Sequence, residues 1–373
     1  MNFEEHAAKP LLKAAGISVP DGGLAKSADE AAVIAEKIGP CVVKAQVPTG
    51  KRGKAGGIAL AATPDEARNE ASRILDLEIA GLPVNSVLVE QQVPIAKEFY
   101  AAVLNDSDSK GPLLLFSAEG GMDIEEIAEN HPDALVRLPV DIRKGLSDDM
   151  LASAIPEIEG VERVQLLDTL SKLYQAYTLN DAELMEINPL VATTDGHVIA
   201  LDCKFSLDDS ALKRHEELAK TGAPDKLTEI EQRGQDIGFK YIELEGNVGV
   251  LSNGAGLTMT TMDAISHYGG EPANFLEIGG NAFTLGKQAL EVVLGNPRVE
   301  TLLINFCGAI ARTDVMTGGV LEAWDEVNPQ VPVFWSISGT GEDEAKAMLK
   351  EKLGTSSYPT MDEAVKAAVE AVK

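Results

Sequence analysis

Residues 248–256 read VGVLSNGAG, an apolar run that ends in a turn of small residues. The same pattern returns at residues 274–282, 302–309 and 331–341. Apolar strands that run into turns and helices at a spacing of about 26 to 30 residues are typical of βα units in a parallel, doubly wound sheet. Because the pattern occurs four times, we predict an α/β fold for this half of the chain.

The first half of the chain mixes helices and strands without a strict repeat. We predict helices over residues 3–15, 28–38, 64–75, 122–129 and 161–178, and strands over residues 41–47, 58–62, 86–91, 99–104 and 113–117. A polar, weakly periodic stretch at residues 207–238 reads as a linker followed by a helix. The sequence therefore predicts two domains, at residues 1–228 and 229–373.

The chain of 373 residues has a formal net charge of -27, which argues against nucleic acid or an anionic membrane as partner. We favour a solvated acidic surface over a role in attracting cations.

No apolar run approaches the roughly 20 residues that cross a bilayer. The acidic, polar N-terminus does not read as a secretory signal. The three cysteines form no disulfide or metal spacing, which predicts a reducing, cytoplasmic setting.

Residues 44–57, KAQVPTGKRGKAGG, hold four cationic residues and four glycines. Glycines let backbone N–H groups approach phosphates, and lysine and arginine neutralise the phosphate charge. The segment therefore predicts a phosphate-binding loop, with a basic surface loop as the alternative. We expect Lys44 to be rigid on its strand, and Lys51, Arg52 and Lys54 to be mobile on the loop.

Residues 186–190 read EINPL, and Asp202 follows twelve residues after this stretch. A turn at residues 194–196, with glycine last, predicts a hairpin in which Asn188 and Asp202 lie side by side. One amide oxygen and one carboxylate suit a magnesium ion when phosphates and waters supply its other ligands. The alternative is a surface hairpin with ordinary polar residues.

Several other polar residues stand at strand ends. Glu90 and Glu98 are candidates to accept hydrogen bonds from a nucleotide, although for each of them, taken alone, a solvated carboxylate is the favoured alternative. Asn253 and residues 308–312 lie where strands give way to helices, a geometry that favours anions unless the turns serve packing alone. None of the five histidines lies in an exposed glycine-flanked turn or beside an obvious base, so we find no phosphohistidine site in this chain.

Taken together, these motifs resemble the β subunit of succinyl-CoA synthetase, or of a closely related acid–CoA ligase, from end to end of the chain. The most specific stretch is GGEPANFL at residues 269–276, and further landmarks are residues 44–57, 95–98, 118–121, 186–190 and 253–257. The resemblance implies an ATP-grasp domain followed by a flavodoxin-like ligase domain.

Carried over position by position, the resemblance implies nucleotide contacts at Lys44, Lys51, Arg52, Gly53, Glu90, Val93 and Glu98. It implies magnesium ligands at Asn188 and Asp202, and it makes Glu186 the glutamate that receives a swinging phosphohistidine loop of the partner subunit. It implies contacts with the acid substrate at Asn253, Ala309, Ile310 and Ala311.

The implied reaction converts a small carboxylic acid, CoA and ATP into acyl-CoA, ADP and phosphate, with a place in the tricarboxylic acid cycle. An α subunit would carry the phosphohistidine and hold CoA, in an αβ or α2β2 assembly. The lack of a plausible phosphohistidine here fits that division of labour. Pro20 matches a position where family members that use ATP tend to carry proline, which favours ATP over GTP.

The chain departs from the family pattern at Lys51, which stands where the family loop usually has glycine, and at Ala309. Ser336 and Ser338 stand where the family tends to have an arginine and an acidic or amide residue. We therefore keep open a relative of succinate, such as malate or a sulfonated acid, as the substrate. The alternative is neutral drift in a supporting strand.

Two other functions compete with this interpretation. One is an ATP-grasp carboxylate ligase that acts alone, which the second half of the chain argues against. The other is a non-catalytic nucleotide-sensing subunit. The joint presence of Lys44, Glu90, Glu98, Asn188 and Asp202 argues against that alternative, because a subunit without catalysis has no need of them all.

Overall fold

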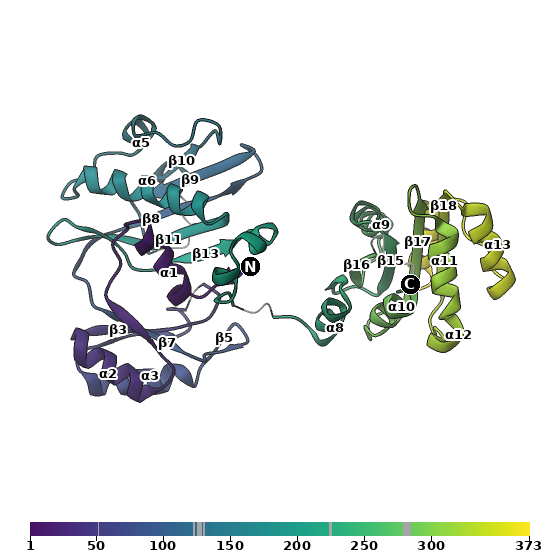
Figure 1. Ribbon diagram of the computed structural model, residues 1–373, viewed down its shortest axis with the longest axis horizontal. Helices are drawn as coiled ribbons and strands as arrows, with labels where there is room; N and C mark the ends of the chain where they lie inside the picture. Colours follow the sequence, from purple (N-terminus) through teal and green to yellow (C-terminus); the bar gives the residue numbers. More distant parts are fainter. Residues whose placement is uncertain (51, 122–123, 125–128, 130, 224–225, 279–284) are drawn as a thin grey trace. The chain divides into compact units, whose positions relative to one another are not determined.

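The computed structural model describes the whole chain except residues 51, 122–123, 125–128, 130, 224–225 and 279–284. It consists of two compact units, Met1–Asp225 and Lys226–Lys373, shown in Figure 1. The predicted domain limits at residues 228 and 229 lie near this division and stay a prediction. The predicted helix over residues 122–129 and the turn after residue 278 fall largely outside the described residues.

An antiparallel sheet of seven strands forms the centre of the first unit (Figure 1). Its strands, in order across the sheet, are β1 (Asn2–Phe3), β13 (Lys204–Leu207), β11 (Ala182–Thr193), β8 (Ile95–Asp106), β9 (Gly111–Ser117) and β10 (Leu135–Pro139), with β12 (Val198–Ala200) paired to β11. The helices α1 (Glu5–Ala14), α5 (Asp148–Ala154) and α6 (Arg163–Leu179) contribute to the apolar core against this sheet. Leu12, Leu170 and Leu173 are fully buried in this core.

A smaller sheet of four strands stands beside it in the same unit (Figure 1). Its order is β2 (Gly22–Ala25), β7 (Val87–Gln91), β3 (Cys41–Ala45) and β4 (Ile58–Ala61), and α2 (Ala28–Ile38) and α3 (Pro64–Leu75) pack against it. β5 (Glu78–Ile79) and β6 (Leu82–Pro83) form a separate pair. Ser27 and Thr63 cap α2 and α3 by accepting hydrogen bonds from backbone N–H groups, which fixes both helix starts where the sequence predicts them.

The second unit contains the predicted doubly wound sheet. Its strands stand in the order β14 (Lys240–Glu243), β16 (Asn274–Ile278), β15 (Val248–Asn253), β17 (Thr301–Gly308) and β18 (Val333–Gly339). The last four are parallel, and only β14 runs antiparallel at the edge. This order reverses between β15 and β17, which is the flavodoxin-like arrangement that the resemblance implies.

Helices cover both faces of this second sheet. The helices α9 (Ala255–His267) and α14 (Met361–Glu370) share an apolar core with one face. The helices α8 (Glu229–Ile237), α10 (Gly286–Leu294), α11 (Thr313–Glu322) and α13 (Glu342–Leu353) pack with the other face. Among the described residues, no helix is long and apolar enough to cross a membrane.

Gly339, at the carboxyl end of β18, provides a test of this packing. Its φ is +88°, and a Cβ there would lie 2.2 Å from the carbonyl oxygen of Gly308. Gly354 has a φ of +67° but no atom within 4 Å of such a Cβ, so it is a matched control. We expect Gly354→Ala to cost about 1 kcal/mol and Gly339→Ala about 2–4 kcal/mol of unfolding free energy.

The measurement is urea unfolding followed by tryptophan fluorescence. The chain has two tryptophans, Trp324 and Trp335, and both lie in the second unit, so their signal reports on this unit. Equal losses in the two variants would contradict the steric argument at Gly339.

Candidate functional site

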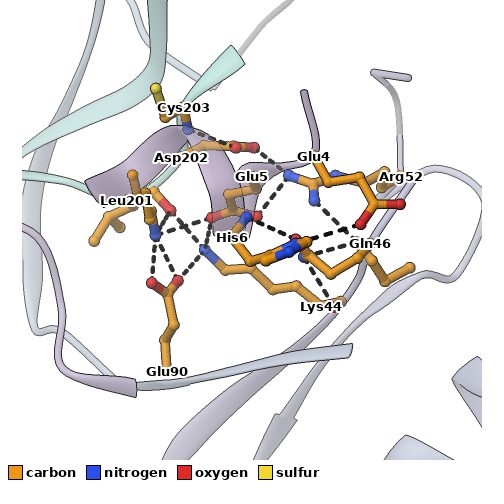
Figure 2. Close-up of polar contacts among 12 residues, drawn as sticks. Glu4, Glu5, His6, Lys44, Gln46, Arg52, Glu90, Leu201, Asp202 and Cys203 are labelled. Atoms are coloured by element: carbon orange, nitrogen blue, oxygen red, sulfur yellow. Dashed lines mark hydrogen bonds and ion pairs between the residues drawn. The ribbon is translucent and has the colours of Figure 1, made fainter. Parts of the chain in front are cut away.

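Six charged side chains meet between the two sheets of the first unit and form what we name the buried ion cluster. Its members are Glu5 and Lys9 from α1, Lys44 from β3, Arg52 from the following loop, Glu90 from β7, and Asp202, two residues after β12. Three cations face three anions, so the cluster is balanced in charge. Figure 2 labels Glu5, Lys44, Arg52, Glu90 and Asp202, whose charged ends face one another and are joined by dashed lines.

Local structure explains why these side chains converge. Glu5 and Lys9 are four residues apart on α1, and this spacing places both on one face of a helix. On the smaller sheet, Glu90 lies opposite Val42, so Lys44 is its diagonal neighbour on the same face. The helix and the sheet therefore present their charges to each other.

The two lysines of the cluster share the same partners. Lys44 Nζ lies 2.9 Å from Glu5 Oε1 and 2.7 Å from Glu90 Oε2, and it donates to the carbonyl of Leu201 at 2.5 Å. Lys9 Nζ lies 2.9 Å from Glu5 Oε1 and 2.6 Å from Glu90 Oε1, and it donates to the Leu201 carbonyl at 2.8 Å. Both lysines are nearly inaccessible to solvent. Glu90 is therefore buried and paired, and its alternative as a solvated carboxylate is wrong.

Arg52 corrects an expectation drawn from the sequence. We expected a mobile loop cation, but Arg52 is only 7% exposed. Its Nη2 lies 2.8 Å from Glu5 Oε2 and 2.7 Å from Asp202 Oδ2, and its Nη1 donates to the carbonyl of Ala45 at 2.9 Å. Partners distant in sequence thus hold the guanidinium in place. Lys54 is exposed, and Lys51 lies outside the described residues.

Neighbouring charges in the cluster lower the pKa of the acid Glu5 and raise the pKa values of the cations Lys44 and Arg52. Burial alone would favour the neutral acid of Glu5, but Lys44, Lys9 and Arg52 together hold its pKa well below the ordinary value. Burial alone would lower the pKa of Lys44, yet Glu5, Glu90 and Asp202 raise it. The pKa of Arg52 is likewise raised by Asp202 and Glu5 against the effect of burial. Every member for which a shift is resolved is thus stabilised in its charged form.

The predicted hairpin that carries Asn188 and Asp202 is present. β11 pairs with β12 with Leu190 opposite Ala200, and Gly196 in the turn has a φ of +88°. Continued by two residues, this register brings Asn188 opposite Asp202. β11 also pairs with β8 and β13, so the hairpin is part of the large sheet. That Asn188 and Asp202 are ligands rather than ordinary polar residues stays a prediction.

The donor set of this hairpin fits a magnesium ion that also binds phosphates. Asn188 offers an amide oxygen, which accepts a hydrogen bond from the N–H of Gly121 at 3.1 Å. Asp202 offers a partly exposed carboxylate next to Arg52. Within the described parts of the chain, no group of three or more His, Cys, Asp or Glu side chains could hold a metal ion. One amide oxygen and one carboxylate suit an ion that arrives with most of its ligands already supplied by phosphates and water.

Three more residues are predicted to contact the nucleotide, namely Glu98, Val93 and Gly53. Glu98, on β8, is close to Gly121, where a Cβ would lie 2.2 Å from Glu98 Oε2. Val93 lies in the segment that joins β7 of the small sheet to β8 of the large sheet, and with Gln91, Gln92 and neighbouring residues it lines a cavity of about 270 Å³. Gly53 forms part of the turn after Arg52, where its carbonyl accepts from the N–H of Gly56.

Glu186 has a partner that the sequence did not suggest. The hydroxyl of Tyr100, on β8, donates to Glu186 Oε2 at 2.9 Å. Tyr100 is 1% exposed, and Glu186 lies on the neighbouring strand β11 opposite Ala102. A buried hydroxyl held by packing thus orients a carboxylate that is partly accessible to solvent.

The predicted acid site lies at the carboxyl ends of β15 and β17, where the strand order of the second unit reverses. The amide of Asn253 spans the two strands: Nδ2 donates to the carbonyl of Cys307 at 2.9 Å, and Oδ1 accepts from its N–H at 2.8 Å. Of the three residues that follow Gly308, Ala309 and Ile310 are exposed and Ala311 is half-buried. Ser338 lies opposite Cys307 on β18.

Glu5, Lys9 and Tyr100 are the members of these sites that sequence reasoning missed. A signal for the first two was present, because positions 5, 8, 9 and 12 form the buried face of α1 and two of them are charged. Charged residues on the apolar face of a helix are buried only when paired. Tyr100 reads as an ordinary core aromatic, and nothing in its spacing marks it.

Comparison with known proteins gives the class to which this fold and these sites belong. Residues 2–192 match the ATP-grasp domain family, and residues 251–373 match the CoA-ligase family. A solved structure of ATP citrate lyase from Methanothrix soehngenii, in complex with citrate and coenzyme A, has the same fold. It is 21% identical, covers 99% of both chains and superposes with a TM-score of 0.72. The class is therefore that of ATP-grasp acyl-CoA ligases.

Curated relatives narrow this class to a family. The ADP-forming succinate–CoA ligase subunit β of Chloroflexus aurantiacus is 45% identical over 359 residues, or 94% of each chain. The GDP-forming succinate–CoA ligase subunit β of Thermus thermophilus is 44% identical over 373 residues. The chain belongs to the family of succinate–CoA ligase β subunits, which confirms the resemblance seen in the motifs.

The lowered pKa of Glu5 leads to a prediction for acid stability. Because the folded pKa lies below the ordinary 4.5, the charge of Glu5 stabilises the fold above that pH and loses this effect as pH falls further. Glu5→Gln should cost about 3–5 kcal/mol of unfolding free energy at pH 7, and this cost should shrink below about pH 4.5.

The measurement is urea unfolding at a series of pH values. Glu36→Gln, which changes an exposed carboxylate on α2, is the control and should cost less than about 0.5 kcal/mol at any pH. A difference between Glu5→Gln and the unchanged protein that stays constant down to pH 3 would contradict the ion pairing of Glu5.

Proposed function

We propose that this chain is the nucleotide-binding, catalytic β subunit of an ADP-forming succinate–CoA ligase, which converts a small carboxylic acid, CoA and ATP into acyl-CoA, ADP and phosphate. The observation that carries the proposal is the buried ion cluster. It unites Lys44, Arg52, Glu90 and Asp202, four residues singled out for nucleotide and metal binding, from four separate parts of the chain.

Phosphoryl transfer needs concentrated positive charge and fixed geometry more than covalent chemistry from the protein. Lys44 and Arg52 would face the phosphates, and the glycines at residues 53, 56 and 57 would let backbone N–H groups approach them. Asn188 and Asp202 would hold Mg²⁺. When bound, the ion would neutralise part of the phosphate charge.

The transferred phosphoryl group needs an acceptor outside this chain. Relatives are named as β subunits, which implies an α partner. We propose that the partner carries the phosphohistidine and most of the CoA site, and that Glu186 receives its histidine loop. The two subunits would form an αβ or α2β2 assembly. The free thiols of Cys41, Cys203 and Cys307 fit a reducing compartment, and we place the enzyme in the cytoplasm.

The identity of the acid rests on the second unit. A relative of succinate, such as malate or a sulfonated acid, is the second candidate. Ser336 is buried and Ser338 exposed on β18, two residues apart and thus on one face of the sheet, and Ser338 lies opposite Cys307 beside Asn253. A serine near the acid site could donate a hydrogen bond to an additional hydroxyl or sulfonate oxygen.

The experiment that tests the proposed function is co-expression with an α subunit, followed by CoA-dependent ADP release. Succinate, malate and a sulfonated acid are compared in parallel, with GTP replacing ATP in a second series, since one close relative is GDP-forming. Turnover with succinate as the best acid supports the first candidate, and a better acid supports the second. Binding of nucleotide without turnover on any acid would favour a nucleotide-sensing subunit.

Asp202→Ala tests the metal ligand. The change removes the carboxylate beside Arg52, and we expect it to abolish nucleotide-dependent phosphorylation of the partner histidine while the chain stays folded. Asp195→Ala, an exposed carboxylate in the turn of the same hairpin, should keep phosphorylation. The measurement is transfer of labelled phosphate from ATP to the α subunit. Normal labelling in Asp202→Ala would show that the metal assignment is wrong.

Tyr100→Phe tests how Glu186 is oriented. A hydrogen bond to a charged group contributes about 1.5–3 kcal/mol, so its loss should slow phosphoryl transfer to the partner roughly tenfold or more. The Kd for ADP should not change. Tyr177→Phe is the control, because the hydroxyl of Tyr177 donates to the neutral amide of Asn105. Equal slowing in both variants would indicate a loss of packing rather than of Glu186 orientation.

A further inference from the structure

We propose that Glu5 is a positioning residue for the phosphate-binding cations, acting through Lys44 and Arg52 from a helix outside the nucleotide-binding loop. The inference rests on the proposed function, because it takes Lys44 and Arg52 to face the phosphates of the nucleotide. It assigns a role to α1 that the motifs of the chain do not suggest.

Among the described contacts, Glu5 alone of the three anions reaches all three cations of the buried ion cluster. Its Oε1 lies 2.9 Å from both Lys9 Nζ and Lys44 Nζ, and its Oε2 lies 2.8 Å from Arg52 Nη2. Of these three cations, the described contacts of Glu90 include the two lysines and those of Asp202 include Arg52. Without Glu5, the side-chain ion pairs of the cluster would therefore fall into two groups, with only the backbone carbonyls of Leu201 and Ala45 still linking the cations to one another.

Glu5 cannot act by touching the nucleotide itself. Its side chain is 1% exposed, and both of its oxygens are directed at cations of the cluster, as Figure 2 shows for Lys44 and Arg52. Lys44 and Arg52 belong to the smaller sheet and its loop, while α1 packs against the large sheet. Glu5 thus fixes the cations of one sheet relative to the hairpin of the other sheet, which carries Asn188 and Asp202.

The same geometry explains why Glu5, rather than Asp202, is suited to this role. In the proposed enzyme, Asp202 would help to hold the metal that accompanies the phosphates, as well as pairing with Arg52. Glu5 would hold neither metal nor phosphate and contacts the cations of the cluster. It therefore keeps Arg52 and Lys44 in place both before and after the nucleotide arrives, which preorganises the site.

Charge balance provides a way to separate positioning from mere stability. Glu5→Gln leaves three cations facing two anions in a buried place, which destabilises the fold. Adding Lys9→Met restores the balance, with Lys44 and Arg52 facing Glu90 and Asp202. The double variant therefore removes the positioning carboxylate while it removes the unpaired buried charge as well.

The experiment measures the Kd for ADP with Mg²⁺ on the full chain by calorimetry, together with Tm and with KM and kcat of the complex with the α subunit. For Glu5→Gln we expect a lower Tm and a Kd raised roughly tenfold or more. For the double variant we expect Tm to recover most of its loss while Kd and KM for the nucleotide stay raised. Glu36→Gln is the control and should change none of these values.

Recovery of both Tm and Kd in the double variant would overturn the proposal, because it would leave Glu5 a purely structural role. An unchanged Kd in Glu5→Gln would overturn it as well. If the unchanged protein bound no ADP at all, the proposed function would fail instead. The two failures are thus distinguished by the first titration.

Discussion

The first unit depends on the burial of balanced charge between its two sheets. The apolar core under the large sheet and the core under the small sheet are separate clusters of residues. What lies between them, at the point where α1 meets β3 and β7, is the buried ion cluster. Such a cluster adds little net stability compared with apolar side chains, although breaking it by one member is costly. Its position around Lys44, Arg52 and Asp202 therefore fits a requirement of the proposed nucleotide site.

The sequence predicted those parts of the fold that depend on residues close together in the chain. Ser27 and Thr63 each stand three residues before a glutamate at the start of a helix, and the helix starts follow from this capping. The repeated apolar strands with small-residue turns predicted the second sheet. The order of the large sheet could not be predicted, because its pairs are remote: β1 pairs with β13, with Asn2 opposite Ser206. Short edge strands such as β14 carry too little pattern to be seen.

The same contrast between local and remote information holds for the site. The hairpin that carries Asn188 and Asp202 was predicted correctly because one short turn fixes its register. The prediction that Arg52 is mobile was wrong. Its partner Asp202 is 150 residues away, and no local sequence pattern indicates that the two residues pair. Glu5 and Lys9 resemble the solvated charges of any acidic chain until the packing of α1 turns them inward. Burial of charge depends on tertiary packing. In a single sequence its only sign is a charged residue at a position where the helical pattern predicts an apolar one.

The contrast between an acidic exterior and a neutral, buried cluster has a consequence for the encounter with nucleotide. The chain carries a formal charge of -27, so an anionic nucleotide approaches it against a repulsive field. Dissolved salt screens that field beyond a Debye length of about 8 Å at physiological ionic strength, but it scarcely weakens buried pairs. Rising ionic strength would thus hasten capture of the ligand while the receiving cations stay in place.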